Sequence, residues 1–114
     1  MKTGSAEYDN SSTICPLDYA FKRIGGKFKG RVILHIHWND NVLRYTELLQ
    51  LIRGVTPKML MHALKELQED GLITRTVYPV VPPRVEYSLT SQAEKLVPFI
   101  LYLSDWGKEQ LQAK

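Results

Sequence analysis

Residues 56–71 read TPKMLMHALKELQEDG, and residues 72–89, which follow directly, read LITRTVYPVVPPRVEYSL. In the first stretch Thr56 is typical of a helix N-cap, and Pro57 is typical of the first helical position, where its missing N–H group would be unpaired anyway. The glycine that closes the stretch is typical of a helix end. The sequence therefore predicts one well-defined helix over about 56–70, with a second structural unit directly behind it.

The second stretch predicts a β-hairpin. Val85, Tyr87 and Leu89 alternate with polar residues, which is the period-two pattern of a half-buried strand. Residues 72–78 supply the other strand, and the prolines between the two runs cannot continue a hydrogen-bonded ladder. We therefore expect a stiff projecting tip with Arg84 beside it.

The helix over 56–70 has two different faces when its residues are placed at about 100° intervals. One face is apolar and is predicted to be core: Leu60, Ala63, Leu64 and Leu67. The opposite face is left for a partner: Lys58, Met61, His62 and Lys65.

Helices are also predicted on both sides of this unit. Upstream, apolar spacing and turn residues indicate a helix from Cys15-Pro16 to Gly25-Gly26 and two more over about 27–37 and 45–52. Downstream, a last helix is expected over about 91–110, with Thr90 as its N-cap and a kink at Pro98.

The composition indicates one domain. The chain has 114 residues, 44% of them hydrophobic, which suits a single core over 15–112 with a polar, flexible tail over 1–14. No apolar run is long enough to span a membrane, so a cytoplasmic protein without a membrane partner is expected. The single cysteine excludes an internal disulfide and multi-cysteine zinc sites.

Catalytic and metal-binding chemistry find little support in the sequence. His35 and His37 would point about 200° apart on a helix and cannot share a metal ion. No arrangement of nucleophile and base is recognisable. We therefore expect no metal, no cofactor and no enzymatic activity.

The positive charge is unevenly distributed. The net charge is only +3, but the segment from Lys22 to Arg31 carries five basic residues and no acidic one. Such a cluster is either a solvated face or a contact surface for a polyanion, and the charge pattern alone does not choose between them.

The last helix is apolar over far more than one stripe. One face can be buried in the core, and the remaining apolar face needs a second chain, so a homodimer is predicted. The alternative is that this helix packs between the first helix and the core of a single chain. The residues expected at the dimer interface are Tyr19, Phe99, Ile100, Leu103 and Trp106.

Together these elements predict a mainly α fold with a small β-hairpin wing, a winged helix-turn-helix that dimerises through its terminal helices. The helix over about 56–70 fits the DNA major groove, and the wing over about 72–89 fits the backbone or the minor groove. A winged-helix module for protein–protein assembly is the alternative. The expected DNA-binding residues are Lys27, Lys29, Arg44, Arg53, Thr56, Lys58, Met61, His62, Lys65 and Arg84.

Five motifs, in order along 15–106, resemble the HxlR family of bacterial winged helix-turn-helix regulators. They are IGGKFK at 24–29, RYTEL at 44–48, GVTPKML at 54–60, DGLI at 70–73 and PPRVEYSLT at 82–90. The resemblance implies a dimeric, sequence-specific transcription regulator that binds a pseudo-palindromic operator in double-stranded DNA, with the N- and C-terminal helices forming the dimer.

Cys15 has two interpretations. Several members of the family have an N-terminal cysteine, often before proline, that senses oxidants or electrophiles. A thiol at a helix N-terminus also feels the positive end of the helix dipole, which favours the reactive thiolate. The alternative is a small residue packed at the dimer interface, because free cysteine is often buried.

Overall fold

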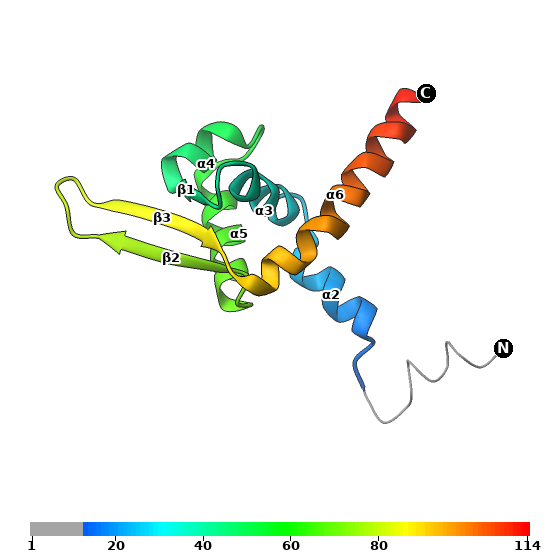
Figure 1. The fold of residues 1–114 in the computed structure, drawn as a ribbon, viewed down its shortest axis with the longest axis horizontal. Helices are drawn as coiled ribbons and strands as arrows, with labels where there is room; N and C mark the ends of the chain where they lie inside the picture. Colours follow the sequence, from blue (N-terminus) through cyan, green and yellow to red (C-terminus); the bar gives the residue numbers. More distant parts are fainter. Residues whose placement is uncertain (1–12) are drawn as a thin grey trace.

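The computed structural model describes residues 13–114, so the predicted tail over 1–14 lies almost entirely outside the described residues. The elements follow one another in the order drawn in Figure 1. They are α2 (Pro16–Ile24), α3 (Lys29–Trp38), β1 (Val42–Arg44), α4 (Tyr45–Leu51), α5 (Pro57–Glu69), β2 (Ile73–Tyr78), β3 (Arg84–Leu89) and α6 (Ser91–Gln112).

α5 starts where the sequence predicts, with the predicted N-cap residue and the predicted proline. The Thr56 hydroxyl oxygen accepts a hydrogen bond from the Met59 N–H group at 3.1 Å, and Pro57 occupies the first turn. Gly71 follows the helix with a φ of 73°, a left-handed conformation that a glycine adopts without strain. The predicted core face is confirmed, with four buried residues: Leu60, Ala63, Leu64 and Leu67.

The hairpin of β2 and β3 is confirmed, and a third strand joins it. β1 pairs antiparallel with β3, so that Leu43 lies opposite Tyr87, and the strand order is β1-β3-β2. β1 was not predicted from the sequence, because three residues are too few to show a periodic pattern. The preceding turn places Asp40 and Asn41 at φ values of 58° and 68°, which these two residue types tolerate better than most.

The core is centred on α3, which lies against α5, α6 and β3. Val32, Ile33 and Ile36 are completely buried, and each contributes roughly 1.5–3 kcal/mol through burial of its side chain. Gly30 lies close to α6, since a side chain placed there would meet Ile100 Cγ2 at 3.8 Å. The central helix therefore fixes the base of α6.

The outer half of α6 leaves the body of the domain and ends at the C-terminus, as Figure 1 shows in orange and red. The helix runs through Pro98 without a break. α2 also lies at the side of the domain from which α6 projects. Within residues 13–114, no helix is long and apolar enough to cross a membrane.

Candidate nucleic-acid interface

The outer face of α5 is open to solvent. Lys58, Met61, His62 and Lys65 are all exposed, as expected from their spacing opposite the core face. This face carries two ammonium groups, an imidazole and a thioether at the N-terminal end and middle of a helix. Such groups can donate to base edges or phosphates and can contact a thymine methyl group.

A further basic residue flanks this face. Arg75 on β2 lines a hollow of about 430 Å³ together with Met61, His62 and Lys65. The sequence analysis did not select Arg75, although the hairpin register pairs it with the buried Tyr87 and so fixes its place on the strand. The sequence predicts the strand that carries Arg75, but it does not predict that this strand lies beside α5.

Arg84 lies at the start of β3, and its guanidinium is held against the wing. Its Nε lies 3.2 Å from Glu86 Oε2, and the group stacks over the Tyr78 ring at 4.6 Å. The side chain is half-buried. The tip of the wing carries apolar side chains, and that of Val81 is completely exposed.

Lys29 was predicted to contact DNA, and its position in the structure argues against this role. Its Nζ lies 2.7 Å from Glu66 Oε1 and donates to the Lys22 carbonyl oxygen at 3.3 Å. The Lys29 side chain is only 13% exposed. Because its ammonium group already has partners within the chain, Lys29 is not expected to contact DNA.

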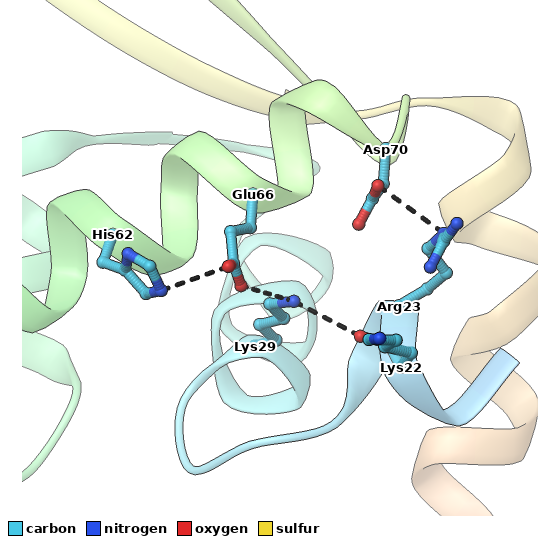
Figure 2. Close-up of polar contacts among 6 residues, drawn as sticks. All are labelled: Lys22, Arg23, Lys29, His62, Glu66 and Asp70. Atoms are coloured by element: carbon cyan, nitrogen blue, oxygen red, sulfur yellow. Dashed lines mark hydrogen bonds and ion pairs between the residues drawn. The ribbon is translucent and has the colours of Figure 1, made fainter. Parts of the chain in front are cut away.

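Figure 2 shows that Lys29 is part of a polar bridge between α2 and α5. His62 Nε2 lies 3.1 Å from Glu66 Oε2, and Arg23 Nε lies 3.5 Å from Asp70 Oδ1. The hydrogen bond from Lys29 is the largest cause that holds the pKa of the Glu66 carboxyl below its ordinary value, and His62 adds to it. The first helix is thus tied to the helix that presents the open face.

The other predicted DNA-binding residues lie on exposed positions near the helix starts. The backbone N–H group of Arg44 donates to Glu47 Oε1 at 2.8 Å, and this hydrogen bond caps the start of α4. The side chain of Arg44 is exposed. Arg53 is exposed while its carbonyl oxygen accepts from Arg31 at 3.1 Å. Lys27 is exposed in the loop before α3, and the oxygen of Thr56 serves as the α5 cap.

An apolar surface extends over α2 and the projecting part of α6. Of the five residues expected at a dimer interface, four are exposed: Tyr19, Phe99, Leu103 and Trp106. Ile100 is different, because it is only 7% exposed and belongs to the core of the single chain. Tyr102, which was not predicted to belong to it, enlarges the surface, and the exposed Phe21 meets Phe99 edge-on at 6.2 Å.

Cys15 is the residue before α2 and is half-buried. Its carbonyl oxygen accepts the first helical hydrogen bond, from the Tyr19 N–H group at 3.0 Å. The described part of the chain contains no group of three His, Cys, Asp or Glu residues that would hold a metal ion.

Comparison with known proteins gives a consistent result. The family model described as HxlR-like helix-turn-helix matches residues 23–114. An HTH-type transcriptional regulator of Bacillus subtilis, YdeP, is 45% identical over 95 residues, which are 83% of this chain and 73% of that protein. One from Methanothermobacter thermautotrophicus is 42% identical over 95 residues, covering 83% and 71% respectively. The structure of the redox regulator HypR in its oxidized form superposes with a TM-score of 0.77 at 39% identity, covering 83% of this chain and 96% of that one.

Proposed function

Because the chain belongs to the HxlR-like helix-turn-helix family of transcriptional regulators, we propose that it binds a pseudo-palindromic operator in double-stranded DNA as a homodimer. It is a DNA-binding regulator and not an enzyme. A regulator of this kind acts in the cytoplasm, where the DNA is.

The observation that carries the proposal is the open face of α5. Its exposed residues lie opposite a buried face, so the core holds the helix while its outer side chains remain exposed to solvent. We assign α5 to the major groove, with Lys58, Met61 and His62 at base edges and Lys65 at a phosphate or a guanine.

Basic residues on both sides of α5 supply contacts that do not depend on base sequence. Arg75 stands beside the outer face, and Lys27, Arg44 and Arg53 are exposed on neighbouring segments. Arg84 lies where the wing would approach the backbone or the minor groove. Each phosphate contact strengthens binding and increases its sensitivity to salt.

The exposed apolar residues of α2 and α6 support the homodimer. Tyr19, Phe99, Leu103 and Trp106 are bulky and exposed, and the part of α6 that carries the last two projects from the domain (Figure 1). A second copy related by a twofold axis would cover this surface. It would also place two α5 helices on successive major grooves, about 34 Å apart along the DNA.

Fluorescence anisotropy on genomic fragments at two salt concentrations tests this function. We expect tight, salt-sensitive binding to a selected fragment and weaker binding to random DNA. The alternative, a winged-helix module for protein–protein assembly, predicts no DNA binding even at about 50 mM salt. The exposed basic residues around α5 favour the regulator.

We also propose that Cys15 makes the regulator responsive to an oxidant or a small electrophile. The thiol lies at the start of α2, the helix that carries part of the apolar surface and is tied to α5. HypR, which resembles this chain in fold and sequence, is described as a redox regulator. With one cysteine per chain, oxidation can join only the two Cys15 residues of a dimer or one Cys15 to a small thiol.

Diamide, which takes two hydrogen atoms from two thiols to form a disulfide, tests this role. Protein treated with diamide, alone or together with an added small thiol, should change its DNA affinity. Mass spectrometry should show a covalent dimer in the first case and a mixed disulfide with the small thiol in the second. Cys15→Ser protein should bind DNA before treatment and should not respond afterwards. Equal affinity of treated and untreated wild-type protein would instead leave Cys15 as a packing residue.

A further inference from the structure

A groove of about 750 Å³ lies between α2, the loop that follows it, and α5. Apolar side chains form much of its lining, namely those of Phe21, Phe28, Met59 and Ala63. The volume is in the range of a small-molecule site, about 300–1,000 Å³, and aromatic and apolar walls are typical of such sites. The groove lies on the side of α5 toward α2, and of the residues that line it only Lys27 and His62 are among those assigned to DNA above.

The rim of the groove is positively charged. Lys22, Lys27 and Lys29 all line it, against a single carboxylate, that of Glu66. Glu66 is already paired with Lys29 and His62, and among residues 13–114 no carboxylate lies within ion-pair distance of Lys22 or Lys27. The groove therefore offers aromatic and aliphatic walls beside two ammonium groups that have no counter-charge.

We propose that this groove is an effector site for a small, flat, apolar anion of the aromatic carboxylate class. The ring system would lie between Phe21, Phe28 and Met59, and the carboxylate would face Lys22 and Lys27. A neutral aromatic molecule gains only the apolar contacts, and a small aliphatic anion gains only the charge contacts. The site thus selects molecules that carry both features.

The groove is placed to affect DNA binding, so this inference deepens the proposed function and rests on it for its regulatory part. His62 belongs both to the groove lining and to the outer face of α5. Glu66, one helical turn further on, is the centre of the bridge between α2 and α5 shown in Figure 2. A bound anion adds negative charge beside the surface assigned to DNA phosphates, and it should lower DNA affinity.

Isothermal titration of the full-length protein with 2-naphthoate, in the absence of DNA, tests the site directly. We expect saturable binding of 2-naphthoate, and binding of the neutral 2-naphthalenemethanol and of acetate that is weaker by about tenfold or more. Lys22→Glu reverses one rim charge without touching the expected DNA-binding set. It should weaken 2-naphthoate binding about tenfold and leave the neutral analogue unaffected.

Lys95→Glu is the matched control, because Lys95 is an exposed lysine on α6 that does not line the groove. It makes the same change in net charge and should leave 2-naphthoate affinity unaltered. Equal weakening by both variants would overturn the site, since it would show a general charge effect. Absence of binding at millimolar 2-naphthoate would overturn it as well.

Two further measurements separate the other possible occupants of the groove. If a second copy covers it, Lys22→Glu will change the dimer dissociation constant and 2-naphthoate will not bind, which overturns the proposal. If Lys22 serves the DNA backbone and not an anion, Lys22→Glu will weaken DNA binding much more than Lys95→Glu does and will leave 2-naphthoate affinity unchanged, which also overturns the proposal. If DNA binding itself fails, the titration with 2-naphthoate still decides whether the site exists.

The regulatory part is tested by anisotropy on a selected DNA fragment. Saturating 2-naphthoate should weaken DNA binding by the wild-type protein about threefold or more, through added negative charge beside the phosphates. Lys22→Glu protein should bind the fragment and show no response at the same concentration. Unchanged DNA affinity with the groove occupied would limit the site to binding without regulation and overturn this part.

Discussion

Lys29 and Glu66 form an ion pair of 2.7 Å that joins the start of α3 to the C-terminal part of α5, and the two residues are 37 positions apart in the chain. Lys29 also donates to the last turn of α2, and Glu66 also meets His62. One ammonium group therefore connects three helices (Figure 2). This contact links the region that carries Cys15 to the helix assigned to DNA.

The first prediction concerns this ion pair. Lys29→Met and Glu66→Gln should each lower the urea midpoint. The double variant should lower it by less than the sum of the two single effects, because each single variant leaves one partner without its counter-charge. The pKa of Glu66 is lowered in the folded chain, so the stabilisation is present above its ordinary value of 4.5 and is lost as the pH falls through the lowered value. Additive losses at pH 7 would show that the two groups act independently.

The second prediction concerns the cap of α5. Thr56→Ala should lower the free energy of unfolding by about 1 kcal/mol, because the Met59 N–H group loses its acceptor. Thr56→Ser keeps an oxygen in nearly the same place and should recover most of the loss. Chemical denaturation of the three proteins measures both values, and an equal loss in the serine variant would mean that the hydroxyl is not the cause.

Local chemistry explains which parts of the fold were predictable. The cap at Thr56, the glycine after α5 and the alternation in β3 act over a few residues, so they can be recognised in the sequence. β1 is only three residues long and exists because it pairs with a strand more than forty residues away. A strand this short shows no periodic pattern in the sequence.

The candidate site was predictable only where it depends on local spacing along the chain. The outer face of α5 follows from helical spacing, whereas the pairing of Lys29 with Glu66 depends on how α3 and α5 pack. Ile100 was assigned to the wrong side of α6, because a helix that is apolar almost all round does not indicate which face is inside. In the structure Ile100 faces α3, where a Cβ placed on Gly30 would lie 3.8 Å from Ile100 Cγ2.

The third prediction separates base reading from backbone contact. Lys58→Ala should reduce discrimination between a selected site and its single-base variants, by about 1–3 kcal/mol at the affected positions. Arg75→Ala and Arg84→Ala should weaken all sequences alike and reduce the slope of log affinity against log salt by about 1 each. Anisotropy over a series of salt concentrations measures both effects. If Lys58→Ala instead lowers the affinity for all DNA sequences equally, Lys58 does not read bases.

The fourth prediction tests the apolar surface on α6. Trp106→Glu places a charge within the proposed interface and should raise the dimer dissociation constant by about 100-fold or more. Trp38→Glu is the matched control, because Trp38 is equally exposed but lies at the end of α3. Light scattering over a dilution series distinguishes them. A dimer that survives Trp106→Glu, or that Trp38→Glu disrupts equally, would place the interface elsewhere.

The fifth prediction concerns His35 and the pH dependence of stability. Burial, and to a smaller extent the charge of Arg31, lowers the pKa of His35 below 6.5 in the folded chain. The unfolded chain therefore binds the proton more readily, so the contribution of His35 to stability is fully present above pH 6.5 and is lost as the pH falls toward the lowered value. The ring also meets Trp38 edge-on, with centroids 5.6 Å apart, which keeps it in this half-buried position.

Urea denaturation at pH 7.5 and 5.5 measures this effect. The wild-type protein should lose stability between the two values, and His35→Gln should lose less, because the glutamine cannot take up a proton. An identical pH dependence in the His35 variant would assign the effect to other groups. Because α5 and α6 pack on α3, protonation of His35 would loosen the frame that holds the DNA-reading face.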